Sequence, residues 1–312
     1  MTDERFVEQL TQHWQRVAKR DRQRELTQPK PLGALVQTDR PYIAQASPLQ
    51  KLNLYFPKNV NLNTEKLPTI IDIHGGGWMY GDCHLNDSYC LFLASQGYAV
   101  MAMSYRLLPQ VGLKEMIEDV FASLHWLELF GSQKGFDLTR VLLVGDSAGG
   151  HLAGLTLCIQ RSPKLQLLYG VEALDFDFDA AVIICGVMEP QKLALGNGIM
   201  SRAAKVQLKL LTRKNTAIAN AAGFSQACRN IKLPPLMIIG SEEDSFWWQT
   251  RLFLRTLTAN KLDFQTKLWR RSRGKHLGHV FNVTHWEWSE SRETNFAMLN
   301  FFKQISASKH KK

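Results

Sequence analysis

Short, continuous apolar runs alternate with longer amphipathic patterns along most of this 312-residue chain. Apolar runs of this length are typical of strands that are buried on both faces of a parallel sheet. The candidate strands are Leu52–Phe56, Thr69–Ile73, Ala99–Tyr105, Val141–Val144, Ala181–Cys185, Leu236–Ile239 and Phe264–Trp269. A short polar stretch joins the first two, so an antiparallel arrangement of that pair stays open.

Helical spacing of apolar residues follows several of these runs. The predicted helices are Leu113–Leu129, Gly150–Gln160, Phe246–Thr258 and Glu287–Gln304. Strands that alternate with helices in this way indicate an α/β fold, with a mostly parallel sheet and right-handed crossovers.

Two segments do not fit the simple alternation. Residues 1 to about 30 carry Phe6, Leu10, Trp14 and Val17 at helical spacing, which predicts one amphipathic helix before the sheet begins. A long insertion separates Cys185 from Leu236, and its stretch Ile199–Leu211 also has helical periodicity. We therefore predict one domain over 1–312, with a helical cap contributed by about 1–45 and about 187–232.

Composition excludes several classes of protein. Hydrophobic residues make up 45% of the chain and charged residues 21%, as in a water-soluble globular domain. No apolar run approaches the length of a membrane span, so no stable membrane insertion is expected, and the N-terminus has no pattern of a secretory signal. The five cysteines lack paired or metal-like spacing, which predicts reduced thiols and a cytoplasmic location.

The formal net charge is +10, and basic residues gather at 19–22, 270–273 and 309–312. Such clusters bind nucleic acids or anionic membranes in some proteins. Here they are not interleaved with aromatic residues, and we interpret them as solvated termini and one basic loop, with no nucleic-acid partner. Whether the basic N-terminus contacts membranes stays open.

The stretch Gly145–Gly149 reads GDSAG and matches G-x-S-x-G. An apolar run precedes it and a helical pattern follows it. This is the setting in which a serine stands on a sharp strand-to-helix turn and exposes its hydroxyl. Ser147 is the candidate nucleophile, and a small residue in a glycine-rich loop is the plainer alternative.

The stretch His74–Trp78 reads HGGGW and follows another predicted strand. Consecutive glycines let main-chain N–H groups approach a carbonyl oxygen that becomes negative during acyl transfer. We expect such an oxyanion hole from the N–H groups of Gly75, Gly76 and Ala148. A plain glycine-rich turn or a phosphate cradle is the alternative, but no P-loop Lys-Ser/Thr follows.

An activated serine needs a base and an orienting acid, which in this topology follow the serine after later strands. Asp244 follows one such strand and is the candidate acid, with Glu243 as its rival. His279 follows another and is the candidate base, with His276 second. The cluster of His276, His279 and His285 also permits a zinc site, but no carboxylate or cysteine has matching spacing, so no metal is predicted.

Taken together, these residues resemble the α/β-hydrolase fold, and within it the carboxylesterases similar to hormone-sensitive lipase and to feruloyl esterases. The resemblance covers about residues 50 to 305. It rests on His74–Trp78 with Gly81, Ser104–Pro109, Glu118-Asp119 with Trp126, Gly145–Gly150, Asp244 and Gly278–Phe281.

The resemblance implies hydrolysis of carboxylic esters by Ser147 through an acyl-enzyme, with His279 as base and Asp244 as orienting acid. It implies a mostly parallel central sheet of about eight strands, no metal or organic cofactor, and a lid formed by the N-terminal helix and the insertion after Cys185. The chain departs from the family pattern at Gln110, where Glu is usual, and at Ser245-Phe246, where Pro-Leu is common. These departures concern the shape of the pocket more than the mechanism.

Bulky residues near the expected site favour short acyl chains on a small-molecule ester; they are Trp78, Tyr80, Phe246 and Trp247. Trp78, Tyr80, Asp146 and Phe246 are the candidate substrate-binding residues, although core packing would also account for the aromatic ones. An arylformamidase or other amidase, or a non-catalytic binding protein on the same fold, are the alternative functions. The sequence sets neither the natural substrate nor the oligomeric state, for which a homodimer is one option.

Overall fold

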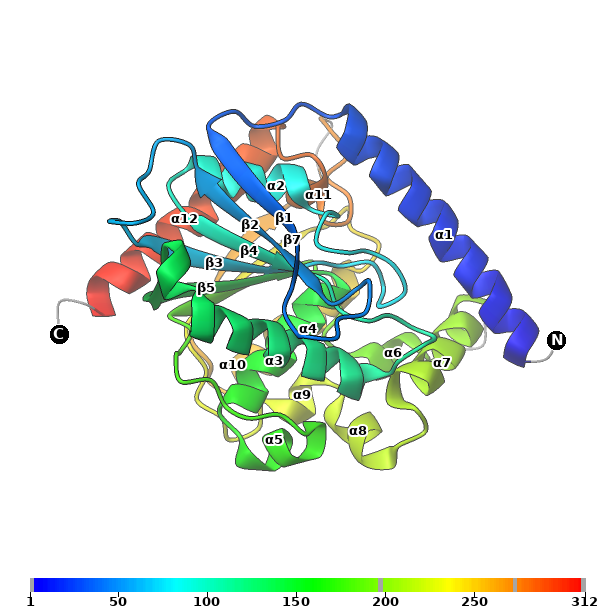
Figure 1. The fold of residues 1–312 in the computed structure, drawn as a ribbon. Helices are drawn as coiled ribbons and strands as arrows, with labels where there is room; N and C mark the ends of the chain where they lie inside the picture. The colour runs from blue at the N-terminus through cyan, green and yellow to red at the C-terminus, as the bar shows by residue number, and fades with distance from the viewer. Residues whose placement is uncertain (1–2, 196–198, 272–273, 310–312) are drawn as a thin grey trace.

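The computed structural model describes residues 3–195, 199–271 and 274–309. Within these ranges an eight-stranded sheet forms the centre of the molecule, in the order β1-β2-β4-β3-β5-β6-β7-β8 (Figure 1). The strands are β1 Ala34–Pro41, β2 Lys51–Pro57, β3 Leu67–Ile73, β4 Ala99–Met103, β5 Phe136–Asp146, β6 Ala180–Ile184, β7 Leu236–Ser241 and β8 Phe264–Trp269. The predicted mostly parallel α/β sheet is thereby confirmed.

From β4 to β8 every pair of neighbours is parallel, whereas β2 pairs antiparallel with both β1 and β4. The apolar runs at Leu52 and Thr69 therefore do run in opposite directions. They are not an adjacent pair, however, because β4 lies between β2 and β3. A short connection along the chain did not make them neighbours in the sheet.

Helices cover both faces of the sheet (Figure 1). Successive strand residues alternate between two cores: Ile71 and Leu143 pack with α3, α4 and α10, while Ile70 and Leu142 pack with α2 and α12. The helices are α1 Asp3–Thr27, α2 Asp87–Ser95, α3 Leu113–Phe130, α4 Ala148–Gln160, α5 Pro163–Tyr169, α6 Pro190–Leu193, α7 Ile199–Thr212, α8 Thr216–Ala221, α9 Phe224–Ala227, α10 Trp247–Ala259, α11 Phe281–Thr284 and α12 Ser289–Lys309, with a 3₁₀ turn at Ser132–Lys134.

The first strand corrects one boundary of the predicted cap. Residues 34–41 were expected to belong to a cap segment that reached about residue 45, but they form β1 at the edge of the sheet. Most side chains of β1 are exposed, including Leu35 and Val36. An edge strand needs no continuous apolar run, and its sequence therefore gave no strand signal.

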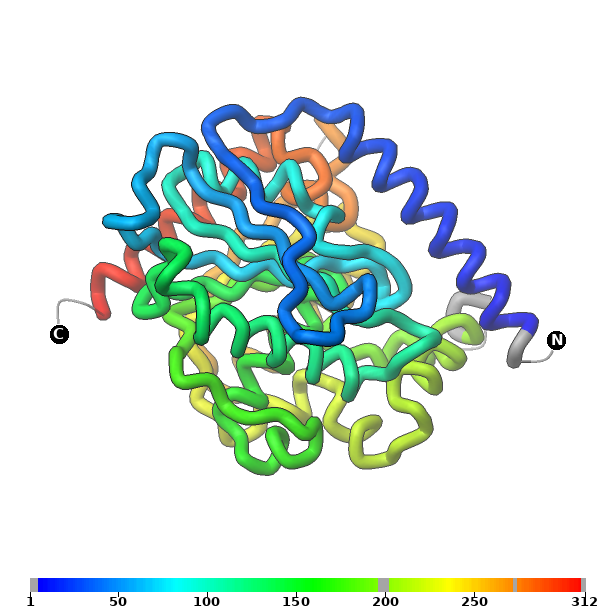
Figure 2. Tube along the Cα trace, viewed as in Figure 1, coloured from blue at the N-terminus to red at the C-terminus, as the bar shows by residue number. Residues whose placement is uncertain are grey.

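The long helix α1 extends along one edge of the molecule, and its N-terminal half lies beside α7 (Figures 1 and 2). Thus the two segments that did not fit the strand–helix alternation lie next to each other. No helix in the described ranges is both long and apolar enough to cross a membrane. All five cysteines are buried and free, and they fill space in the core.

Candidate active site

Ser147, His279 and Asp244 follow three different strands and meet at the carboxyl ends of the sheet. The Ser147 Oγ lies 2.8 Å from the His279 Nε2, and the His279 Nδ1 lies 2.8 Å from the Asp244 Oδ1. These distances suit a neutral imidazole that accepts the serine proton at Nε2 and donates its Nδ1–H to the carboxylate. The Asp244 side chain is fully buried, while the His279 ring keeps 27% of its surface exposed.

Ser147 has a backbone conformation that few residues other than glycine adopt, with φ of 52° and ψ of −115°. Such strain costs about 1–3 kcal/mol and persists only where neighbours enforce it. The Ser147 N–H donates to the Ile184 carbonyl at 2.9 Å, and the Ser147 carbonyl accepts from the Val187 N–H at 3.1 Å. Both partners follow or end β6, so the sheet itself holds the strained turn.

Gly149 is required by a close approach of two main chains. A Cβ atom at this position would lie 1.9 Å from the Ile73 carbonyl oxygen and 2.4 Å from that of His74. The start of α4 is therefore packed directly on the end of β3. This contact places the serine turn beside the glycine-rich loop that follows β3.

The structure of this loop differs from the prediction at one expected oxyanion donor, Gly75. The Gly75 N–H donates to the Asp146 Oδ1 at 3.0 Å, and a donor turned toward this buried carboxylate does not reach a substrate oxygen. In contrast, Gly76, Gly77 and Ala148 line the same pocket as Ser147. Among the described residues, no hydrogen bond uses the N–H of Gly76 or Gly77. The Gly75 N–H is therefore already engaged, contrary to expectation, and Gly77, which sequence reasoning did not select, is the candidate donor in its place.

Glu243 and His276, the alternative acid and base, are not part of the hydrogen-bonded line of Ser147, His279 and Asp244. The Glu243 carboxylate accepts from the Leu277 N–H at 2.7 Å and lies 3.6 Å from the His276 ring. The His276 side chain is 75% exposed. His285 stacks on Trp288 with ring centroids 4.0 Å apart. Of the alternatives that the sequence left open, only His279 bonds to Ser147, and only Asp244 bonds to His279.

Two groups of side chains bring donor atoms together that could ligate a metal, within the part of the chain described. They are Asp39, Cys83 and His84, and Cys185 with Asp244 and His279. Burial raises the pKa of the Cys83 thiol to about 12 and that of Cys185 well above its usual value. Both thiols are therefore protonated at neutral pH in the metal-free protein. The suspected cluster of His276, His279 and His285 forms neither group.

A pocket of about 470 Å³ opens above Ser147. The four candidate substrate-binding residues, Trp78, Tyr80, Asp146 and Phe246, all line it. Trp78 is also 2% exposed and packs edge-on against His151, and the Asp146 carboxylate also accepts from the Gly75 N–H. Lining residues without a sequence motif include Trp14, Asn86, Val187, Leu193 and Gln207.

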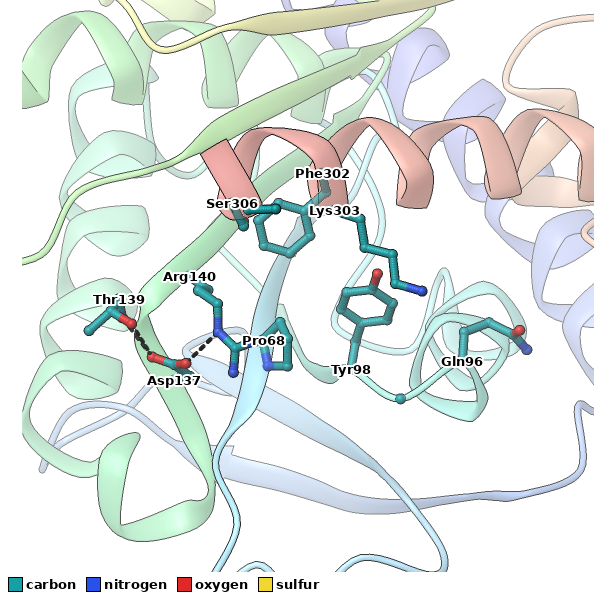
Figure 3. A pocket seen from close by; sticks show the side chains of 11 residues that line it. Pro68, Gln96, Tyr98, Asp137, Thr139, Arg140, Phe302, Lys303 and Ser306 are labelled. Atoms are coloured by element: carbon teal, nitrogen blue, oxygen red, sulfur yellow. Dashed lines mark hydrogen bonds and ion pairs between the residues drawn. The ribbon is translucent and has the colours of Figure 1, made fainter. Parts of the chain in front are cut away.

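Another hollow, of about 600 Å³, lies at the opposite ends of the strands (Figure 3). Pro68, Tyr98 and Asp137 line it at the starts of β3, β4 and β5, and Phe302 of α12 covers it. Ligands of open α/β sheets bind beyond the carboxyl ends of the strands. This hollow has no serine paired with a histidine, and we place the candidate active site at the pocket above Ser147.

Behind the glycine-rich loop, Asn86 connects two buried carboxyl groups. Its amide donates at 3.0 Å both to the Asp72 Oδ2 and to the Asp146 Oδ1. Burial, and then the nearby charge of Asp146, raises the pKa of Asp72 to about 8, although the hydrogen bond from Asn86 opposes the shift. Burial also raises the pKa of Asp146. Asp72, which is unusual inside an apolar run, thus supports the loop as a carboxyl group that is largely protonated at neutral pH.

Asp72→Asn should therefore change how stability depends on pH. Because the folded pKa of about 8 exceeds the ordinary value of 3.8, the folded chain retains a proton that the unfolded chain loses between these values. This carboxyl group lowers the free energy of unfolding as pH rises through that window, by at most about 1.4 kcal/mol per pH unit. The asparagine side chain does not titrate, so the stability of the variant should rise relative to wild type from pH 5 to pH 8.

Urea unfolding at pH 5, 6.5 and 8 measures this difference. Asp175→Asn, at an exposed position, is the matched control and should run parallel to wild type. Parallel curves for Asp72→Asn as well would show that Asp72 ionises normally in the folded chain.

Comparison with known proteins places this site in a family. A family model described as the alpha/beta hydrolase fold matches residues 70–277. The crystal structure of esterase B from Lactobacillus rhamnosis (HN001) is 47% identical, covers 99% of this chain and 98% of its own, and has a TM-score of 0.96. A second structure of that esterase, described as inhibited with a C4-C4 Sn3 tributyrin phosphonate, is 47% identical over 100% of this chain and 98% of its own, with a TM-score of 0.95.

Similarity to curated sequences is more local. Esterase LipI from Mycobacterium tuberculosis is 36% identical over 103 residues, which are 33% of this chain and 32% of LipI. The match thus spans about a third of that relative's length. The family model, by contrast, covers more than half of this chain and includes the candidate nucleophile and acid. The chain therefore belongs to the alpha/beta hydrolase fold family.

Proposed function

We propose that this chain is a serine carboxylesterase that cleaves short-chain acyl esters through an acyl-enzyme. The observation that carries the proposal is the continuous line of hydrogen bonds from Ser147 through His279 to Asp244, which opens into a pocket. A non-catalytic binding protein would have no need for this complete arrangement. The 47% identical esterase B, which matches along its whole length, supports the same activity.

In the proposed first step, the Ser147 Oγ attacks the ester carbonyl carbon while its proton passes to the His279 Nε2. Asp244 stabilises the imidazolium that results. The negative charge moves to the carbonyl oxygen, which accepts hydrogen bonds from the N–H groups of Gly76, Gly77 and Ala148. The C–O bond to the alcohol then breaks, and the alcohol leaves with the proton from His279.

The second half of the proposed reaction, hydrolysis of the acyl-enzyme, uses the same groups. Water attacks the acyl carbon and gives a proton to the His279 Nε2, and a second tetrahedral intermediate forms at the same oxyanion donors. Its collapse releases the carboxylic acid, and the proton returns to the Ser147 Oγ. Each group ends in its starting state, so the chemistry requires no cofactor.

We propose a cap made of α1 and the insertion after Cys185, as the resemblance implies. Six residues of α1 line the pocket, together with Leu193 of α6 and Gln207 of α7; the six are His13, Trp14, Val17, Arg20, Asp21 and Arg24. The cap would exclude water from the reacting ester. A cytoplasmic location and the assembly state, for which a homodimer is one option, stay predictions.

A preference for short acyl chains follows from the size of the pocket and its aromatic lining. A volume of about 470 Å³ is shared by the acyl and alcohol parts of the substrate. Phe246 lies against His279, with ring centroids 5.1 Å apart, and narrows the space beside the base. The tributyrin phosphonate named for esterase B also has four-carbon chains.

On p-nitrophenyl acetate, butyrate, octanoate and palmitate, kcat/KM should be highest for acetate or butyrate and at least about tenfold lower for palmitate, since one methylene too many for a pocket costs about 1–3 kcal/mol. Phe246→Ala should raise the ratio of octanoate to butyrate hydrolysis several-fold. Trp248→Ala, on the exposed side of α10, should leave the ratio unchanged.

An anilide and an aryl formamide complete the panel. Faster cleavage of the formamide than of every ester would favour the amidase alternative. A preference for palmitate would contradict only the proposed chain length, whereas no turnover of any ester would contradict the esterase proposal itself.

A further inference from the structure

The oxyanion loop, defined here as His74–Gly81, has a backbone that its own sequence does not favour. Gly76, Gly77 and Trp78 have φ values of 99°, 59° and 60° in succession. Glycine adopts such angles freely, but Trp78 has a Cβ, and the left-handed region costs an ordinary L-residue about 1–2 kcal/mol. The loop therefore depends on contacts from outside to keep its shape.

The catalytic core supplies part of this support. A carbonyl and the N–H of the next residue lie in one rigid peptide plane, so a bond to the carbonyl also orients that N–H. The His74 Nδ1 lies 2.8 Å from the Gly75 carbonyl, a contact that orients the Gly76 N–H. The Tyr105 hydroxyl lies 2.9 Å from the His74 carbonyl and 3.2 Å from that of Gly75. The Met79 N–H donates to the Gly76 carbonyl at 3.0 Å, which orients the Gly77 N–H.

The next peptide plane is held from α7. The Gln207 side-chain amide donates to the Gly77 carbonyl at 2.5 Å, across 130 residues of sequence. Gly77 and Trp78 are the two residues of the loop on either side of this plane. An amide hydrogen bond from the insertion thus fixes the part of the loop that carries the strain.

The remaining support comes from α1. A Cβ atom at Gly77 would lie 2.4 Å from the Cζ2 of Trp14, so the indole ring lies directly on the loop backbone. The same ring stacks on Tyr80, with centroids 5.4 Å apart and planes 28° apart. The Tyr80 hydroxyl donates to the Asp21 Oδ2 at 2.5 Å. Asp21 also forms an ion pair with Arg24, one helical turn further along α1, at 2.9 Å.

We propose that Trp14, Asp21 and Gln207 are positioning residues that hold the oxyanion loop in its active shape. Contacts from α1 and from α7 converge on adjacent residues of one loop, so docking of the cap sets the rate of the chemical step as well as access to the pocket. This inference rests on the proposed function, because it takes Gly76 and Gly77 as oxyanion donors.

A positioning role has a kinetic signature that a covering role lacks. Oxyanion donors bind the transition state more strongly than the ester, so their displacement lowers kcat and leaves KM nearly unchanged. A cap that only shapes the pocket would affect KM when it is weakened. The split between kcat and KM therefore separates the two roles.

Gln207→Glu is the sharpest test, since the side chain keeps its shape but presents a carboxylate oxygen to the Gly77 carbonyl. On p-nitrophenyl butyrate it should lower kcat about tenfold or more and change KM less than about twofold. The rate of serine phosphonylation by a p-nitrophenyl alkylphosphonate, whose adduct resembles the tetrahedral intermediate, should fall in parallel. Gln226→Glu adds the same charge at an exposed position of the insertion and should match wild type.

A second pair of variants tests the contact from α1 without depending on how Gln207→Glu folds. Asp21→Ala removes the acceptor of the Tyr80 hydroxyl and should lower kcat several-fold. Asp21→Asn retains an oxygen that accepts this bond and should restore most of the loss. Thermal melting of each variant identifies any that fail to fold.

Unchanged kcat in folded Gln207→Glu and Asp21→Ala, with or without a raised KM, would overturn the inference and leave the esterase proposal intact. Equal losses in Asp21→Ala and Asp21→Asn would also contradict it for α1. If wild type itself hydrolyses no ester, it is the proposed function that fails.

Discussion

Ser147→Ala should reduce kcat for p-nitrophenyl butyrate by about 10⁶-fold, because loss of the nucleophile removes the covalent pathway altogether. The alanine variant should nonetheless fold like wild type. In the described structure the Ser147 hydroxyl bonds to the His279 ring, whereas the strained turn is held by main-chain bonds to Ile184 and Val187, which alanine keeps. Steady-state kinetics and thermal melting measure the two effects separately.

Covalent labelling gives an independent readout for the same residue. A fluorophosphonate should attach to wild type at a single serine, and peptide mass spectrometry should locate it at Ser147. Ser147→Ala should remain unlabelled. An alanine variant that keeps full activity, or a label on another serine, would show that the nucleophile had been assigned wrongly.

Asp244→Asn should have the second-largest effect, a fall in kcat of about 10⁴-fold. The carboxylate accepts the Nδ1–H of His279 at 2.8 Å and so leaves Nε2 free to take the serine proton. The amide of an asparagine would donate to Nδ1 instead, and the proton would then occupy Nε2, where it blocks proton transfer. The kcat of the purified variant at neutral pH tests this directly.

Glu243→Gln is the matched control for Asp244→Asn. It makes the same chemical change on the neighbouring residue, whose carboxylate accepts from the Leu277 N–H and not from His279. We expect it to stay within about threefold of wild type, as is usual for substitutions away from the reacting groups. If Glu243→Gln were the more damaging change, the orienting acid would be Glu243.

The proposed coupling of cap and oxyanion loop gives a physical reason for the presence of a tyrosine at position 80, between the HGGGW motif and Gly81. Its ring stacks on Trp14, and its hydroxyl donates to the Asp21 carboxylate. Burial, and then the Asp21 charge, raises its pKa well above the usual value, so the hydroxyl keeps its proton and remains a donor. The contact between Tyr80 and α1 is therefore independent of pH across the neutral range.

Periodicity in the sequence was sufficient to predict most of the sheet. The runs at Val141 and Leu236 are continuously apolar because helices cover both faces of these strands. Burial on both faces can therefore be recognised in the sequence. The sequence did not predict β1, because most side chains of this edge strand are exposed and form no continuous apolar run. The order of strands was also beyond the sequence, since β2 and β3 follow one another along the chain with β4 inserted between them in space.

The sequence by itself determined the chemical groups: a serine in GDSAG, an HGGGW loop, and an acid and histidine in the required order after later strands. Motifs are local, and each constrains only the strand end on which it stands. Tertiary structure alone brings Asp244 rather than Glu243, and His279 rather than His276, into the hydrogen-bonded line with Ser147, because neighbours in sequence point to different surroundings. It also decided that Gly75 faces Asp146 and that Gln207 reaches Gly77, since the direction of a peptide N–H depends on loop dihedrals and on partners far away in the chain.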